Sequence, residues 1–143
     1  VPRFSTGIPV TLGYVKSPKN DLLIRPYPDY SWHSSHGTNC DFMTSVVRVA
    51  IDRCNQIWIL DTGVIGSTRK CPPQLLVFNL LNDKLVKRFK FPQSQYTDIS
   101  LFITPVRLIV VSGYNDDDKI IKNLILILSD SRRSRLIAKM RKH

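Results

Sequence analysis

Four short apolar segments follow one another at nearly even spacing in the middle of the chain. Each is rich in Val, Ile, Leu, Phe or Trp, and the breaks between them carry Asp, Asn, Gly and Pro. This rhythm is typical of strands in an antiparallel meander and not of helices. Four such strands form one blade of a β-propeller or one sheet of a sandwich. The predicted strands are Val46–Ile51, Ile57–Asp61, Gln74–Leu80 and Val86–Phe91.

Weaker patterns extend the all-β prediction on both sides of the meander. An extended segment is predicted around Val10–Val15 and a further strand around Leu101–Val106. Two more strands are predicted at Leu108–Ser112 and Leu124–Leu128, joined through the Asp-rich turn at 116–118, whose composition indicates a turn more than a calcium loop.

Eight stretches of the chain resemble the major royal jelly protein/yellow family, which are insect secreted six-bladed propellers. No single stretch is diagnostic, but all eight occur in one unbroken order and include the rare string CPPQLLVF. The resemblance implies an incomplete β-propeller, with about one four-stranded blade and flanking strands of the six-bladed fold. The stretches are Gly7–Val15, Pro26–His33, Thr44–Asp52, Trp58–Gly63, Cys71–Asn79, Asp83–Leu85, Phe89–Tyr96 and Ser100–Val106.

The resemblance ends after Val106. We therefore assign residues 1–106 to the N-terminal part of a propeller and residues 107–143 to a divergent basic tail, as from a shortened transcript or a gene model that runs off an exon. An authentic short isoform is the alternative. In the tail, Leu136, Ile137 and Met140 fall at helical spacing, which predicts a short basic helix over Ser134–Lys142. Because a single blade exposes faces and edges that neighbours would cover, we expect the chain alone to be marginally stable and prone to aggregate.

The net charge of +10 is denser in the C-terminal part of the chain, because residues 107–143 carry the same charge as the much longer part before them. Residues 1–106 carry 12 Lys and Arg against 7 Asp, and residues 107–143 carry 9 against 4, so each part contributes +5. An excess of basic over acidic residues is typical of proteins that bind nucleic acids or acidic membranes. No helix-turn-helix, zinc-finger or RNP pattern accompanies it, so we expect a solvated basic surface and no nucleic-acid partner.

No apolar span of 18 residues occurs, and the most apolar stretch, Ile120–Leu128, is interrupted by Lys122 and Asn123. We expect no membrane span. The chain starts at Val1 with no visible signal peptide, which indicates a trimmed N-terminus or a start inside a longer reading frame. Secretion to the extracellular space is implied by the family resemblance.

The three cysteines leave one unpaired, and the meander indicates which. Cys40 and Cys71 precede the first and third strands and so lie at one end of the blade, whereas Cys54 lies in the turn at the other end. A five-residue strand is roughly 17 Å long, and a disulfide needs Cα atoms within roughly 7 Å. The predicted disulfide is Cys40–Cys71. The resemblance implies that a cysteine of the next blade would be the partner of Cys54.

A zinc site is the competing interpretation of this region, because His33, His36 and Cys40 form H-x2-H-x3-C, followed by Asp41. No second paired cluster follows, and the intervening residues are those of a polar loop. We expect a solvated loop that ends in a disulfide, without metal or other cofactor.

Few sequence motifs in the chain are typical of catalytic sites. Asp61-Thr62-Gly63 is the motif of aspartic proteases, but those enzymes need two such motifs and Asp98-Ile99-Ser100 fails the pattern. No G-x-S-x-G nucleophile motif occurs. The prediction is that no catalytic residues are present and that Asp61 caps the turn after the second strand.

Two features remain as candidates for ligand contact. Tyr27, Tyr30 and Trp32 could line a ligand mouth, although packing against a blade edge is the more frequent use of such rings. Arg48 interrupts an apolar strand, and alternation places Val46, Arg48 and Ala50 on one face. The first strand of a propeller blade lines the central channel, so Arg48 is the candidate ligand-binding residue.

The resemblance implies two functional classes for the full-length protein. The first is a secreted protein that binds a small amine or other ligand in the channel, or that serves a structural or pigmentation-associated role. The second is a melanin-pathway enzyme of the dopachrome-conversion type. Binding ranks first because no set of catalytic residues can be recognised in the sequence. We expect neither activity from this chain alone, since a channel needs all its blades.

Overall fold

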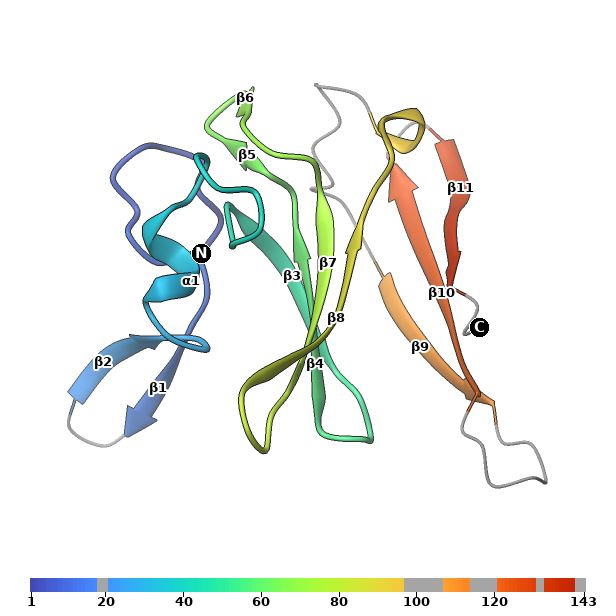
Figure 1. Ribbon diagram of the computed structural model, residues 1–143, viewed down its shortest axis with the longest axis horizontal. Helices are drawn as coiled ribbons and strands as arrows, with labels where there is room; N and C mark the ends of the chain where they lie inside the picture. The colour runs from blue at the N-terminus through green and yellow to red at the C-terminus, as the bar shows by residue number, and fades with distance from the viewer. Residues whose placement is uncertain (18–20, 97–106, 114–120, 131–132, 141–143) are drawn as a thin grey trace. The chain divides into compact units, whose positions relative to one another are not determined.

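The computed structural model describes residues 1–17, 21–96, 107–113, 121–130 and 133–140 (Figure 1). The chain divides into two units, Val1–Leu101 and Phe102–His143. Strands make up nearly all the regular structure of the described residues, which confirms the all-β prediction. The strand expected around Leu101–Val106 and the turn at 116–118 lie outside these residues.

The centre of the first unit is a four-stranded antiparallel sheet in the order β3-β4-β7-β8. It confirms the predicted meander, because each strand begins and ends within two residues of its expected bounds (Figure 1). The topology is that of one propeller blade. The strands are β3 (Val46–Ile51), β4 (Gln56–Asp61), β7 (Gln74–Asn79) and β8 (Lys84–Lys90).

The hairpin turns of the blade form because polar side chains bind the turn backbone. Asp52 Oδ1 accepts from the amides of Cys54 at 2.8 Å and Gln56 at 3.0 Å, and its Oδ2 accepts from Trp58 Nε1 at 2.9 Å. Between β7 and β8, Asn79 Oδ1 accepts from the amide of Leu81 at 2.7 Å. These Asx-type bonds end each strand where its apolar run ends.

A small hairpin between β4 and β7 was not expected from the sequence. It pairs β5 (Val64–Ile65) with β6 (Thr68–Arg69), between the strands predicted at Ile57–Asp61 and Gln74–Leu80. Gly63 precedes it with φ of +71°, and a Cβ at this position would lie 2.0 Å from the carbonyl oxygen of Cys71. Only glycine fits this close approach.

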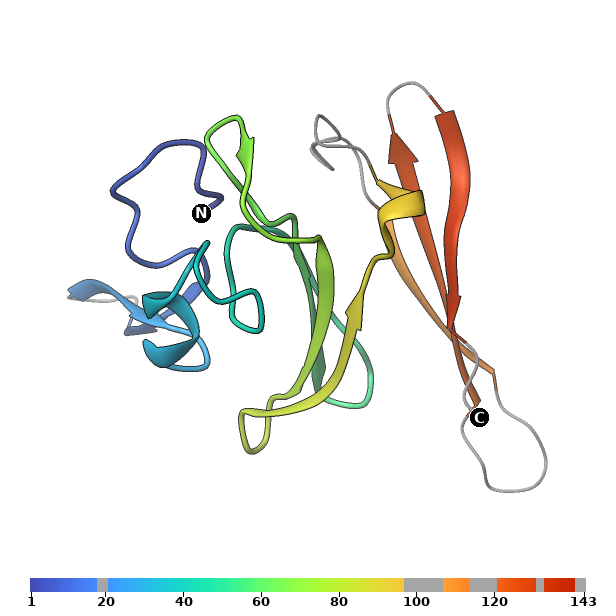
Figure 2. The ribbon, with the colours of Figure 1, turned by 45° about the horizontal axis from the view of Figure 1, so that its top comes forward.

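The N-terminal segment lies beside one face of the blade (Figures 1 and 2). It contains the hairpin β1 (Gly13–Ser17) and β2 (Asp21–Pro26) and the short helix α1 (Ser31–Ser34). The extended segment predicted around Val10–Val15 thus becomes a strand only from Gly13. A core cluster joins the segment to the sheet and consists of Tyr27, Met43, Val46, Ile57, Ile59, Leu76 and Phe78.

Aromatic rings provide much of this contact. The Phe78 ring lies edge-on to Tyr27 at 6.0 Å and to Trp32 at 4.8 Å between centroids. Such pairs add about 0.5–1.5 kcal/mol beyond their buried area. Tyr27 and Trp32 therefore pack against the blade, while Tyr30 is exposed.

The second unit is a three-stranded antiparallel sheet in the order β11-β10-β9. β9 (Arg107–Gly113) and β10 (Ile121–Asp130) confirm the two strands predicted here. The helix predicted over Ser134–Lys142 is wrong, because β11 (Arg133–Met140) pairs with β10 from Met140 opposite Leu124 to Arg133 opposite Asp130. Pairing with a long strand outweighs the weak helical spacing of three apolar residues.

A disulfide links Cys40 and Cys71, with Cα atoms 5.4 Å apart. It confirms the predicted pairing, since both residues lie at the same end of the blade and Cys54 lies in the turn at the other. Cys54 is a free, exposed cysteine.

Non-reducing peptide mapping should recover a Cys40–Cys71 link and leave Cys54 open to alkylation. The sequence separation of 31 residues gives the bond a stabilising effect of roughly 3–4 kcal/mol in the chain-entropy model. Reductant should therefore unfold the chain readily, as monitored by circular dichroism. Recovery of a Cys54–Cys71 link would contradict the blade topology.

Candidate functional site

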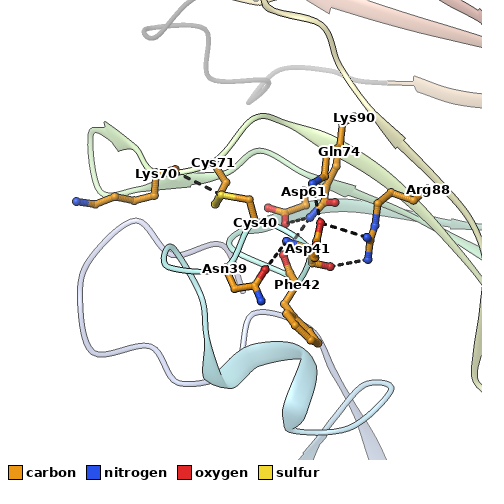
Figure 3. A network of polar contacts seen from close by, with 10 residues as sticks. All are labelled: Asn39, Cys40, Asp41, Phe42, Asp61, Lys70, Cys71, Gln74, Arg88 and Lys90. Atoms are coloured by element: carbon orange, nitrogen blue, oxygen red, sulfur yellow. Dashed lines mark hydrogen bonds and ion pairs between the residues drawn. A yellow bond between two sulfur atoms is a disulfide. The ribbon is translucent and has the colours of Figure 1, made fainter.

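A network of polar contacts occupies the end of the blade where the disulfide lies (Figure 3). Its centre is Asp61, the last residue of β4, whose side chain is fully buried. Oδ1 accepts from the amides of Ser45 at 2.7 Å and Gly63 at 3.0 Å. Oδ2 accepts from the amide of Thr44 at 2.8 Å and from Gln74 Nε2 at 3.2 Å. The carboxylate is thus fully engaged in holding the backbone, including the predicted turn after β4.

Asp41 makes the exposed part of the same network (Figure 3). Its Oδ1 lies 2.7 Å from Lys90 Nζ and 3.3 Å from Arg88 Nη1. The hydrogen bond from Lys90 is the main reason that the pKa of Asp41 is lowered. These ion pairs tie the loop before β3 to β8, but solvent screens them, so they contribute little to stability.

Arg3 is a buried cation that sequence analysis missed. Its Nε donates to the Ile8 carbonyl at 2.7 Å, and its two terminal nitrogens donate to the carbonyls of Pro9, at 2.7 Å, and Thr44. Burial lowers the pKa of the guanidinium, an effect that the attraction of Asp61 partly opposes. An arginine near the start of a chain carries no pattern that distinguishes it from a solvated one, so no sequence signal identified this role.

The residues of the zinc interpretation each have other contacts. Cys40 is in the disulfide. His33 is buried, with Nε2 2.9 Å from the Tyr27 carbonyl oxygen and Nδ1 3.5 Å from the Thr11 amide. Because a carbonyl can only accept, these partners require a neutral ring protonated on Nε2. Across the described residues, no group of three or more His, Cys, Asp or Glu side chains is placed to hold a metal ion.

The Asp-Thr-Gly motif is likewise structural in its contacts. All four hydrogen bonds of the Asp61 carboxylate are to amide donors, and Thr62 Oγ1 donates to the Ser45 carbonyl at 3.2 Å. No second carboxylate takes part in these contacts, whereas a protease of this type needs a pair.

Arg48 lies exposed on β3, which is an edge strand of the blade. The expected alternation is corrected at one point, because the pairing slips between Val46 and Arg48. Arg48 lies opposite Leu60, whereas Val46 lies opposite Asp61 and joins the core cluster on the other face. A bulge at Val47 therefore separates two residues that simple alternation placed together. The role of Arg48 in ligand binding stays a prediction.

The first unit centres on an antiparallel blade of propeller type, held at one end by a disulfide and a buried carboxylate. The sequence model of the family described as "Major royal jelly protein" matches residues 44–138. The chain belongs to the major royal jelly protein family. The match extends into the segment after Val106, and the division proposed there stays a prediction.

Individual relatives include major royal jelly proteins, a dopaminechrome tautomerase and yellow proteins. The chain is 42% identical over 88 residues to major royal jelly protein 9 of Apis mellifera, which covers 60% of this chain and 20% of the relative. It is 32% identical over 124 residues to the dopaminechrome tautomerase of Drosophila melanogaster, which covers 82% of this chain and 26% of the relative. It is 34% identical over 126 residues to the protein yellow of the same fly, which covers 82% of this chain and 22% of the relative. The chain thus spans about a quarter or less of each relative's length.

No helix among the described residues has both the length and the apolar character needed to cross a membrane.

Replacing Asp61 by Asn should destabilise the chain by on the order of 3 kcal/mol, because an amide nitrogen replaces one of two buried oxygens that each accept two hydrogen bonds. Chemical denaturation of the oxidised chain measures this change. Asp41→Asn is the matched control, since it removes an exposed carboxylate from the same network and should leave the unfolding midpoint close to wild type. Equal effects of the two substitutions would contradict the central role of Asp61.

The free energy of unfolding should decrease as the pH falls from about 7 to about 5. Burial lowers the pKa of His33 in the folded chain, while the unfolded residue titrates near 6.5. Between these two pKa values only the unfolded chain binds the proton, so acid favours unfolding. His33→Gln should be less stable at neutral pH but show a flatter profile over this range. An unchanged slope in the variant would exclude His33 as the cause.

Proposed function

We propose that this chain is the N-terminal part of a secreted family protein that binds a small ligand without turning it over, or that serves a structural, pigmentation-associated role outside the cell. The ligand would be a small amine or a similar molecule held in the central channel of the complete propeller. One blade alone encloses no channel, so the chain by itself is inactive.

The observation that carries this proposal is the position of Arg48. It is exposed on an edge strand, opposite the buried Leu60, and within the described part of the chain its side chain makes no ion pair. A guanidinium group stacks on aromatic rings and donates to oxygen atoms. Arg48 would therefore contact the ring or a ring oxygen of an aromatic amine, and not its ammonium group.

The contacts of the other polar residues favour binding over catalysis. Asp61, Arg3 and His33 are buried and are engaged by backbone groups, so none is available as an acid, base or nucleophile. Asp41 is paired with Lys90.

The alternative is a melanin-pathway enzyme of the dopachrome-conversion type. It is favoured by the relative named dopaminechrome tautomerase, which aligns with 82% of this chain.

A chimera separates the two functions. Residues 1–106 would replace the matching part of the Drosophila melanogaster protein yellow, which supplies the remaining blades. Isothermal titration with catecholamines and indoleamines should show saturable binding, and Arg48→Ala should weaken it roughly ten-fold, as expected for loss of one cation–π contact. Arg53→Ala, an exposed arginine in the adjoining turn, is the control and should bind as wild type.

The same chimera is assayed for consumption of dopaminechrome by absorbance. Turnover that is lost in Arg48→Ala would favour the enzyme. Equal binding by the two arginine variants would overturn the assignment of Arg48.

A further inference from the structure

A pocket of about 260 Å³ lies at the disulfide end of the blade, between the N-terminal loop, the loop after α1 and the β5–β6 hairpin. Its lining includes the cationic side chains of Arg3 and Lys70, the imidazole of His36 and three hydroxyl groups. Arg48 is not part of it. None of the described residues that line it is acidic.

The lining of this pocket is basic. Arg3 is 1% exposed and bonded only to carbonyl groups through its side chain, so it holds a full positive charge beneath the pocket floor. The nearby carboxylate of Asp61 attracts the guanidinium and offsets part of its charge, but Asp61 does not line the pocket. Lys70 is exposed at the rim, and Figure 3 shows its side chain extending away from Asp41, on the other side of the disulfide. Two cations around a recess without carboxylates attract anions.

The pocket is also held in shape by covalent structure. Lys70 adjoins Cys71 and Gly37 lies three residues before Cys40, so the disulfide holds the two walls together. The walls touch closely, since a Cβ at Gly37 would lie 3.1 Å from Ile65 Cδ1 and 3.4 Å from Lys70 Cβ. His36 Nδ1 lies 2.7 Å from the His33 carbonyl oxygen and must donate to it, so Nε2 of the neutral ring is an acceptor and offers no hydrogen bond to an anion.

We propose that this pocket binds a small oxyanion, either a free inorganic anion or the carboxylate of a small organic acid. Lys70 pairs with the anion at the rim, Arg3 supplies a fixed positive charge below it, and the hydroxyl groups of Ser5 and Thr6 donate hydrogen bonds. The volume equals that of several water molecules and lies below the range of drug-sized sites, which favours a small ligand. Ile65 offers an apolar wall that would suit the ring of an aromatic acid.

The test is a titration of the oxidised 143-residue chain in phosphate-free buffer, followed by nuclear magnetic resonance. Inorganic phosphate and benzoate are the two probes, and they distinguish a free oxyanion from an organic carboxylate. We expect saturable, millimolar binding of at least one probe. Lys70→Ala should weaken binding at least three-fold, and Lys70→Glu should abolish it, because a carboxylate then faces the anion.

Three control variants make the result decisive. Lys87→Ala removes an exposed lysine of β8 that does not line the pocket and should bind as wild type. Thr6→Trp keeps the charge but fills the pocket and should block binding. Absence of saturable binding to the folded chain, or equal weakening by Lys87→Ala and Lys70→Ala, would overturn the proposal. Arg48→Ala should leave this binding unchanged, which keeps the outcome separate from the function proposed for the channel.

Discussion

The carboxylate of Asp61 is the interaction on which the rest of the first unit depends. It ends β4 inside the protein, where an unpaired charge would cost several kcal/mol. Four amide donors from three separate parts of the chain prevent this cost. The segment before β3, the turn after β4 and the start of β7 are therefore placed by one side chain. Arg3 brings in the N-terminal segment, since it donates to the Thr44 carbonyl beside the same carboxylate.

This arrangement also explains why polar residues at this end of the blade do not resemble a catalytic site. Acid–base chemistry needs groups that can exchange protons with a substrate, whereas Asp61, Arg3 and His33 are satisfied by backbone partners and are nearly inaccessible. Two exposed cations, Lys70 beside the small pocket and Arg48 on the edge strand, are the groups to which we assign ligand contacts as proposals.

Local patterns predicted the blade well and long-range contacts poorly. The four strands followed from apolar runs that end in Asx-type turns, and the disulfide followed from counting strand directions. The bulge at Val47 could not be seen, because it depends on Val46 pairing with Asp61 across the sheet. The β11 strand was missed for a related reason, since its partner β10 decides its conformation and its own spacing favoured a helix. Arg3 was missed because no local pattern marks an arginine that donates to backbone carbonyls, and Gln74 was missed because its partners lie far away in sequence. Gln74, for example, bonds to the Phe42 carbonyl 32 residues earlier.

The close contact at Gly63 links backbone geometry to the choice of cysteine partner during oxidation. Gly63 receives hydrogen bonds from the amides of Lys70 and Cys71 through its own carbonyl, and the carbonyl of Cys71 occupies the space where a side chain would stand. Any larger residue at this position must displace the backbone of Cys71, whose sulfur is bonded to Cys40. The thiol of Cys54 is exposed and available, so such a substitution would expose the folding chain to mispaired and intermolecular disulfides. The absence of a side chain at Gly63 thus lets Cys71 occupy the position from which it pairs with Cys40.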